Sequence, residues 1–127
     1  MQKLVANRIQ TPDGTILQSF HRHDYKTHVD SVTGEEYMID GGLDYCRTNV
    51  NSVPAKDLSV YLDSPFEEIR EAFCWGTRGK DGKSPLTWKP LAKLDTDHIS
   101  AILVTQTHIE DWLRGLFQKE LDLRCGK

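Results

Sequence analysis

Apolar and polar residues alternate at period two through much of the first half of the chain and repeat at helical spacing in most of the second half. Between residues 25 and 30, for example, Tyr25, Thr27 and Val29 alternate with more polar neighbours, which is typical of a strand with one buried face. Similar patterns predict strands over 4–9, 15–21, 37–39 and 58–62. The first half is therefore expected to form an antiparallel β-sheet meander.

Turn-forming residues separate these predicted strands. Thr11-Pro12-Asp13-Gly14 has the composition of a tight turn between the first two, and Thr33-Gly34-Glu35 should close the next hairpin. Gly41-Gly42 should end the strand that follows. Residues 49–56 are expected to be an irregular connection.

Helical spacing begins after Ser64-Pro65-Phe66-Glu67, which has the form of a capping box with proline at the first helical position. This helix should pack one face on the sheet and end at Gly76. Asp95 is predicted to cap a second helix that starts at Thr96. A further capping-box pattern over 107–110 predicts that this helix kinks or restarts there.

The last predicted helix carries a wide apolar stripe. Its members are Ile109, Trp112, Leu113, Leu116, Phe117 and Leu121. The stripe either covers the sheet of the same subunit or is partly buried by another subunit, and the two interpretations have equal weight. With a short strand over 86–88, the pattern predicts an α+β fold: an antiparallel β-sheet meander in the N-terminal half packed with two to three helices, the last long and apolar on one face.

The composition limits the possible partners. The chain has 127 residues, which favours a single domain over 1–127, and its formal net charge is −3. An acidic balance argues against long nucleic acid as a partner, because such binding needs a broadly basic face. No apolar run has membrane-spanning length, no signal-peptide pattern is present, and the 3 cysteines do not indicate a disulfide framework or a metal knuckle. We expect a soluble, intracellular protein without a membrane partner.

The segment between Trp75 and Trp88 is the strongest candidate for function. Its glycines and cations interleave in the order Gly76, Arg78, Gly79, Lys80, Gly82 and Lys83. Glycine lets backbone N–H groups approach a ligand, arginine and lysine suit phosphate, and indole rings can stack on a base. The alternative is an ordinary hairpin whose tryptophans belong to the core, and without other information this alternative is favoured.

More arginines could complete an anion site. Arg22, Arg47 and Arg114 lie on separate predicted elements and could converge with Arg78 on a diphosphate, because each guanidinium can make a directional, bidentate contact. Polar residues nearby could read ribose hydroxyls or a base edge, namely Asp24, Asn49 and Asn51.

The sequence supports metal binding and catalysis less than it supports an anion site. His21, His23 and His28, with Asp24 and Asp30, form the densest group of possible ligands, but His28 should face away from the other two histidines on a strand. A polar strand with hydrogen-bonded histidines is the favoured interpretation, so no metal or other cofactor is expected.

The remaining nucleophiles and carboxylates have simple structural explanations. Cys74 lies in an apolar, predicted helical run, where its pKa should be raised. Asp40 and Asp44 flank Gly41-Gly42 and could act as an acid–base pair, but an Asp-Gly turn is favoured. No catalytic residue is therefore assigned, and we expect a protein that is not an enzyme.

Several blocks of the sequence together resemble a known family of small phage proteins. The blocks are His21-Arg22-His23-Asp24-Tyr25, residues 37–45 (YMIDGGLDY), Ile69-Arg70-Glu71 running into residues 75–82 (WGTRGKDG), Pro85-Leu86 with Trp88 and Pro90-Leu91, and Asp97-His98-Ile99. This pattern is similar to the first Thoeris anti-defence family, and the likeness covers most of the chain.

The resemblance implies a specific activity. Members of that family sequester cyclic nucleotide immune signals without degrading them, notably a cyclic ADP-ribose isomer made by bacterial TIR-domain proteins. Some also hold cyclic oligonucleotides of the CBASS defence at a separate site. Members form dimers that assemble further, with the signal near the subunit interface, and use aromatic stacking on adenine and arginines on phosphate.

For this chain, the resemblance implies ligand-binding roles for Arg22, Asp24, Arg78, Trp88 and Arg114. The composition of the tryptophan-flanked segment adds two further candidates, Trp75 and Lys80.

The expected function is sequestration of a cyclic ADP-ribose-type signal in the cytoplasm of the host bacterium. The expected assembly is a homo-oligomer, a dimer assembling into a hexamer. Two alternatives remain at this point: a metal- or histidine-dependent cyclic nucleotide phosphodiesterase that uses His21, His23 and Asp24, and an inhibitor that binds a host protein through its last helix.

Overall fold

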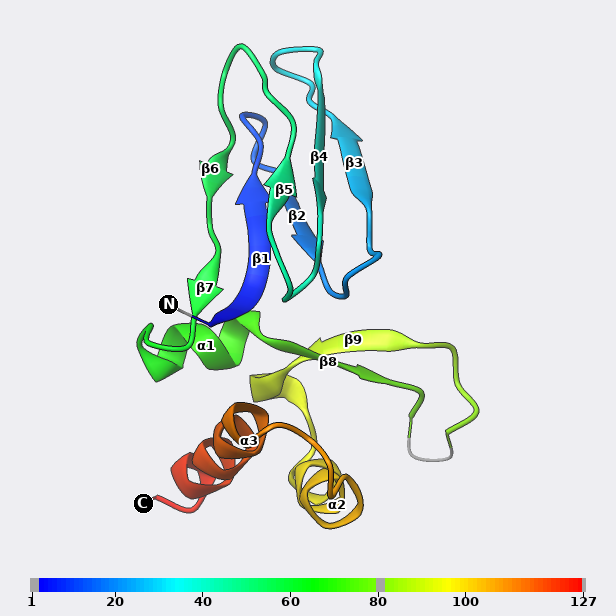
Figure 1. Ribbon diagram of the computed structural model, residues 1–127, viewed down its shortest axis with the longest axis vertical. Helices are drawn as coiled ribbons and strands as arrows, with labels where there is room; N and C mark the ends of the chain where they lie inside the picture. Colours follow the sequence, from blue (N-terminus) through cyan, green and yellow to red (C-terminus); the bar gives the residue numbers. More distant parts are fainter. Residues whose placement is uncertain (1–2, 80–81, 127) are drawn as a thin grey trace. The chain divides into compact units, whose positions relative to one another are not determined.

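The fold is α+β, as the sequence predicts, and its N-terminal half is rich in strands (Figure 1). The structure is a computed structural model that describes residues 3–79 and 82–126. The chain divides into two compact units, unit 1 over Met1–Phe73 and unit 2 over Cys74–Lys127. A single domain over 1–127 stays a prediction.

Unit 1 contains two antiparallel sheets and a helix. Its elements are β1 (Leu4–Gln10), β2 (Ile16–Ser19), β3 (Lys26–Val29), β4 (Glu36–Asp40), β5 (Arg47–Thr48), β6 (Lys56–Asp57), β7 (Val60–Tyr61) and α1 (Phe66–Ala72). One sheet has the order β2-β1-β6, with β7 also paired to β1, and the other has the order β3-β4-β5. The predicted strand over 58–62 is thus shorter than expected, and the chain returns to β1 twice.

The core of unit 1 draws on residues of both sheets, but the face that the alternation from Tyr25 to Val29 predicts to be buried is exposed. Ile9 and Leu17 from one sheet form a buried apolar cluster with Tyr37 and Ile39 from the other. Asn7 is also fully buried, and its side-chain amide donates hydrogen bonds to the carbonyl oxygens of Asp40 at 3.0 Å and Tyr45 at 3.1 Å. These hydrogen bonds fix the position of β1 relative to the end of β4 and the loop after it, because a buried donor must find an acceptor.

Helix α1 begins one residue later than the capping-box pattern implies. Pro65 occupies the N-cap position, and no side-chain cap bond is made there. The Ser64 hydroxyl instead accepts a hydrogen bond from the Tyr61 backbone N–H at 3.1 Å. The capping role predicted for Ser64 was therefore wrong, although the predicted helix itself is present.

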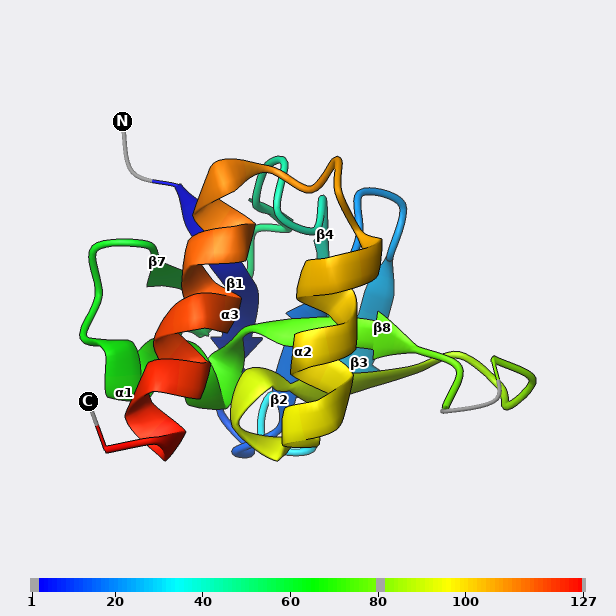
Figure 2. The same cartoon turned by 90° about the horizontal axis from the view of Figure 1, so that it is seen from below.

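Unit 2 combines a β-hairpin with helices. Its elements are β8 (Cys74–Thr77), β9 (Thr87–Pro90), the 3-10 turn η1 (Leu91–Lys93), α2 (Thr96–Thr105) and α3 (Asp111–Arg124). Helices α2 and α3 lie side by side within this unit (Figures 1 and 2). The predicted break near residues 107–110 is present, because α2 ends before it and α3 starts after it.

The prediction that Gly76 ends the first helix was wrong. Helix α1 stops at Ala72, and residues 74–77 form β8, in which Gly76 pairs with Trp88 of β9. A Cβ at Gly76 would lie 3.2 Å from atoms of the Trp88 ring, so the glycine is explained by the ring that packs on it. Cys74 accordingly starts a strand and does not lie in a helix.

Two residues of the apolar stripe are buried in α3, Leu116 and Phe117, whereas Trp112, Leu113 and Leu121 are only partly buried.

None of the helices in the described ranges has both the length and the apolar content that crossing a membrane requires.

Candidate functional site

A cavity of about 560 Å³ lies in unit 2 between the β8–β9 hairpin and α2. We call it the Trp75 pocket. Its lining comprises Trp75, Gly76, Thr77, Arg78 and Gly79 from the hairpin, and Asp97, His98, Ala101, Ile102, Thr105 and Gln106 from α2 and the residue after it. Its volume is in the range of small-molecule sites. The structure therefore brings two of the residues predicted to bind ligand, Trp75 and Arg78, to one cavity.

The Trp75 ring packs against the ring of Phe117 in α3. Trp75 is half-buried, and its ring meets the buried Phe117 ring of α3 edge to face, with centroids 5.2 Å apart and planes at 84°. Such aromatic pairs are directional as well as apolar. Phe117 therefore limits the orientations of the indole that lines the pocket.

Trp88 lies on the other face of the hairpin. Residues paired across an antiparallel ladder share a face, and neighbours along a strand alternate. Gly76 pairs with Trp88, so the Trp88 ring shares the face of Gly76, while Trp75 and Thr77 share the opposite one. The structure does not place the two tryptophans on either side of one ligand site.

The polar part of the pocket lies just after the C-terminal end of β8. Arg78 is exposed, and His98 is partly buried on the facing helix. The Thr77 hydroxyl accepts a hydrogen bond from the Gly79 backbone N–H at 3.2 Å, which fixes the chain where the strand ends. A smaller hollow of about 380 Å³ shares Thr77, Gly79 and His98 with the pocket and adds Lys89. The site therefore combines an apolar wall with charged side chains of both signs, Arg78 and Lys89 against Asp97 and Asp95.

The contribution of α2 was not predicted from the sequence. Asp97 and His98, then Ala101 and Ile102, then Thr105 follow one face of the helix at helical spacing. The spacing is visible in the sequence and indicates a common face, and residues 97–99 also belong to one of the blocks that carry the family resemblance. What the sequence did not indicate is that this face lies opposite β8.

Arg114 has a structural role in unit 2. Its guanidinium donates hydrogen bonds to the carbonyl oxygens of Leu103 at 3.1 Å and Gln106 at 3.0 Å, at the C-terminal end of α2. Carbonyl groups at a helix end lack partners within the helix, and a cation there is favourable. Lys80, another residue predicted to bind ligand, lies outside the described residues.

Arg22 and Asp24 belong to unit 1. Arg22 is exposed, with its Nε 3.9 Å from a carboxylate oxygen of Asp44. The Asp24 carboxylate accepts hydrogen bonds from the Phe20 backbone N–H and the Lys26 ammonium, each at 2.8 Å. Desolvation opposes ionisation, but these bonds hold the pKa of Asp24 below its usual value. Asp24 therefore stabilises its own turn.

Two blocks of the family resemblance meet in this part of unit 1. Gly42 has φ +54°, and a Cβ there would lie 2.2 Å from the backbone carbon of His21. Gly41 has φ +104°, and a Cβ would lie 2.0 Å from the Tyr45 carbonyl oxygen. Only glycine fits such positions without displacing backbone. Asp40 pairs with Arg47 in this region, which supports a structural explanation for its carboxylate.

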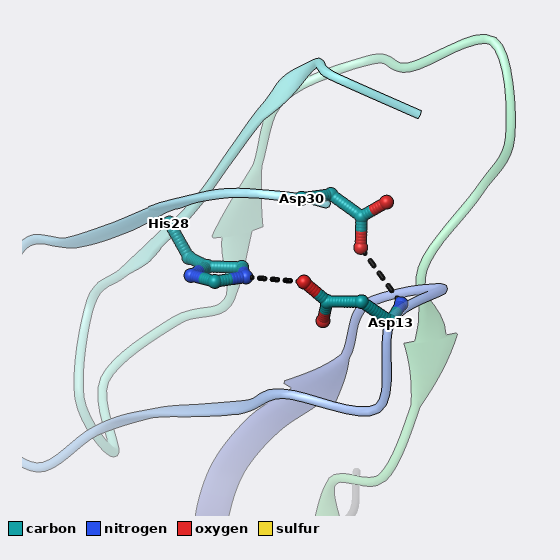
Figure 3. Close-up of side chains that lie close together, drawn as sticks. All are labelled: Asp13, His28 and Asp30. Carbon is teal, nitrogen blue, oxygen red and sulfur yellow. Dashed lines mark hydrogen bonds and ion pairs between the residues drawn. The ribbon is translucent and has the colours of Figure 1, made fainter. Parts of the chain in front are cut away.

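His28 and Asp30 form a cluster with Asp13 in unit 1 (Figure 3). One ligand atom from each of these residues lies within 4.8 Å of the others, a spacing compatible with a metal ion. His28 Nε2 is 2.8 Å from an Asp13 carboxylate oxygen, and the Asp13 backbone N–H donates to Asp30 at 2.8 Å. The sequence groups His28 and Asp30 with His21 and His23, whereas the structure groups them with Asp13.

The carboxylate oxygens of this cluster already accept hydrogen bonds from two turns. Asp13 accepts from the backbone N–H groups of Thr15 at 3.0 Å and Ser31 at 2.9 Å. The buried Asp30 accepts from the backbone N–H groups of Val32 at 3.0 Å and Thr33 at 2.7 Å. This arrangement joins the β1–β2 turn to the β3–β4 turn, which is a structural role.

These bonds make the stability of unit 1 depend on pH. Bonds from Ser31 N–H, His28 and neighbouring groups hold the pKa of Asp13 far below its usual value. Asp13 thus stabilises the fold fully above its unfolded pKa of about 4, and this stabilisation is lost as the pH falls towards the folded pKa. We expect the free energy of unfolding in urea to decrease steadily as the pH is lowered from 6 to 2.5.

Asp13→Asn tests this assignment. The amide cannot ionise, so the variant should be less stable at pH 6 and its stability should fall less steeply with acid. The exposed Asp63→Asn is the matched control, and it should retain the parent slope. An Asp13→Asn variant with the parent's full pH dependence would contradict the assignment.

Comparison of the chain with protein-family models, with curated proteins and with solved structures finds no match.

Proposed function

We propose that this chain is a phage anti-defence protein that binds a cyclic ADP-ribose-type immune signal and holds it without cleaving it, in the cytoplasm of the host bacterium. CBASS cyclic oligonucleotides are a second ligand class in this proposal. The observation that carries it is the meeting of Trp75 and Arg78 in the Trp75 pocket. The choice of ligand rests on the sequence blocks that resemble the Thoeris anti-defence family.

Part of the lining suits a ligand with a flat ring and a phosphate, and the phosphate would lie away from the Asp97 carboxylate. Trp75 and Ile102 provide apolar surface, and an indole face can stack on a base. Arg78 at the rim offers a planar fork of donors that fits phosphate oxygens, and Lys89 in the adjoining hollow adds a second cation. A nucleotide placed this way has its base against the hairpin and its phosphate towards Arg78.

Sequestration requires tight binding, and enclosure by several subunits would provide it. We propose that the chain forms a homo-oligomer, a dimer assembling into a hexamer, in which the partly buried side chains Trp112, Leu113 and Leu121 of α3 contribute to contacts between subunits. Native mass spectrometry with a cyclic ADP-ribose isomer reports subunit number and ligand number in one measurement.

The fate of the ligand distinguishes binding from catalysis. After incubation with a cyclic ADP-ribose isomer and denaturation of the protein, chromatography should recover the ligand intact. Recovery of a ring-opened product would instead support a phosphodiesterase or hydrolase.

Arg78→Ala should weaken binding of the cyclic ADP-ribose isomer by about tenfold or more, because a charge-assisted hydrogen bond contributes about 1.5–3 kcal/mol. The exposed position of Arg78 means that folding should be unaffected. Isothermal titration calorimetry measures the change. Lys119→Ala, which removes a cation from the exposed face of α3 in the same unit, is the control and should bind like the parent. Equal affinity of the Arg78→Ala variant and the parent would remove Arg78 from the site.

A further inference from the structure

Unit 1 has a separate cavity of about 300 Å³ between the edge strands β5 and β6. We call it the Asp57 cavity. Its lining comprises Ile9, Tyr37, Cys46, Thr48, Asn49, Val50, Asn51, Pro54, Ala55 and Asp57. The connection from residue 49 to residue 55 arches from β5 to β6 in Figure 1 and forms one wall of the cavity.

The register of the strands explains why the cavity has an apolar floor and an acidic rim. Asp57 pairs with Ile9 across β1 and β6, and Thr48 pairs with Ile39 across β4 and β5. Paired residues share a face, so Asp57 and Thr48 lie on the faces that carry the buried cluster. A carboxylate is thereby placed at the edge of an apolar core.

The connection that closes the cavity is held in place. The Asn49 side chain accepts from the Met38 backbone N–H at 2.9 Å and donates to the Glu36 carbonyl oxygen at 2.7 Å. The Asn51 amide donates to the same carbonyl at 2.9 Å, and the Tyr37 hydroxyl donates to the Val53 carbonyl. These bonds order the wall before any ligand binds, which lowers the entropy lost on binding.

The charge of the cavity is negative. Among the described residues that line it, Asp57 is the one with a carboxylate, and lysine and arginine are absent. The nearest guanidinium along β5, that of Arg47, lies on the opposite face of the strand from Thr48 and pairs with Asp40. One Asp57 oxygen accepts from the Ser59 backbone N–H at 2.9 Å, and a carboxylate can accept several further bonds.

The Asp57 carboxylate also acts on Cys46, which lines the same cavity. Desolvation, together with the charges of Asp57 and Asp40, raises the pKa of the Cys46 thiol. Desolvation, the larger cause, disfavours either charge, whereas the two carboxylates disfavour an anion in particular. The Asp57 cavity therefore differs from the Trp75 pocket, whose lining includes the cation of Arg78 as well as the carboxylate of Asp97.

We propose that the Asp57 cavity binds a small organic cation with an apolar body and a planar amidinium or guanidinium head. The head donates two hydrogen bonds to the Asp57 carboxylate, and the apolar body lies against Ile9 and Ala55. This site does not depend on the nucleotide-binding function proposed for unit 2.

Benzamidine, benzamide and benzoate are a nearly isosteric series with charges of about +1, 0 and −1 near neutral pH. In ¹⁵N-resolved NMR titrations, benzamidine should shift amide resonances between residues 46 and 57 and bind at least about tenfold more tightly than benzamide, with benzoate weakest. Absence of benzamidine shifts in this segment, or benzoate binding as tightly as benzamidine, would overturn the proposal.

Asp57→Asn isolates the charge. The amide oxygen can still accept from Ser59 N–H, so the backbone there should be retained, which the dispersion of the NMR spectrum checks. The variant should lose about tenfold or more in benzamidine affinity. Asp63→Asn, which removes the same charge from an exposed position outside the lining, should bind as the parent does. Equal benzamidine affinity in the Asp57→Asn variant and the parent would also overturn the proposal.

Alkylation provides a second measurement. Cys46 and Cys125 are both exposed, and Cys46 alone of the two lines the cavity. Benzamidine should slow the reaction of Cys46 with iodoacetamide, mapped by peptide mass spectrometry, and leave Cys125 reacting at its original rate. Equal rates at Cys46 with and without saturating benzamidine would place the probe outside the cavity.

Discussion

Replacing Arg124 with methionine should destabilise unit 2 by about 3–5 kcal/mol, the typical cost of breaking a buried ion pair by removing one partner. Glu120 is fully buried in α3, and Arg124 Nε donates to its carboxylate at 2.7 Å. The same guanidinium donates to the Thr96 hydroxyl at 2.9 Å and the Leu91 carbonyl oxygen at 3.2 Å. Its loss therefore affects a buried charge and the attachment of α3 to two other elements.

Methionine is the informative replacement because it retains an apolar stem that can pack where the arginine stem lay. All 3 tryptophans belong to unit 2, so urea unfolding followed by tryptophan fluorescence reports on this unit. Adding Glu120→Gln to Arg124→Met should recover part of the lost stability, since it removes the buried charge. Lys119→Met is the control on the exposed face of the same helix. A change below about 0.5 kcal/mol for Arg124→Met, the range typical of surface substitutions, would contradict the assigned role.

Local patterns predicted the elements well, because they depend on neighbours in the sequence. Period-two alternation identified the strand that ends at Val29 but not its buried face, because Tyr25 and Val29 are exposed. Thr11-Pro12-Asp13-Gly14 does turn the chain between β1 and β2. The pairing of β1 with both β6 and β7 was not predicted, because it joins distant segments. Gly76 was misassigned for a related reason: its neighbours resemble a helix end, but the ring that requires a glycine belongs to Trp88, across the hairpin.

The candidate site shows the same division between local and distant information. The composition of residues 75–88 indicated Trp75 and Arg78, which the structure places in one pocket. Convergence of arginines could not be judged from sequence, because a guanidinium has many possible acceptors. Arg114, for instance, donates to carbonyl groups at the end of α2. The link between Asp13 and Asp30 was equally inaccessible, since it depends on two turns meeting in space.

Phe117→Ala should destabilise unit 2 by about 3–5 kcal/mol and should also alter the Trp75 pocket. Phe117 is fully buried, and its ring supports the Trp75 ring at a centroid distance of 5.2 Å. Truncation leaves a cavity behind the indole and removes the contact that restricts its orientation. We therefore expect a lower urea midpoint, a displaced Trp75 indole N–H resonance in the ¹⁵N-resolved NMR spectrum, and weaker binding of any ligand that stacks on this ring.

Leu116→Ala separates the two effects. Leu116 is also buried in α3, so its truncation should lower the free energy of unfolding by about 2–5 kcal/mol. It removes no aromatic ring from Trp75, and the indole resonance should therefore move much less than in Phe117→Ala. If both variants displaced that resonance equally, the ring pair would not be what orients Trp75. Conversely, a displaced indole in Phe117→Ala alone would mean that a core residue of α3 sets the geometry of the pocket wall, so that stability and ligand affinity are coupled through a single aromatic contact.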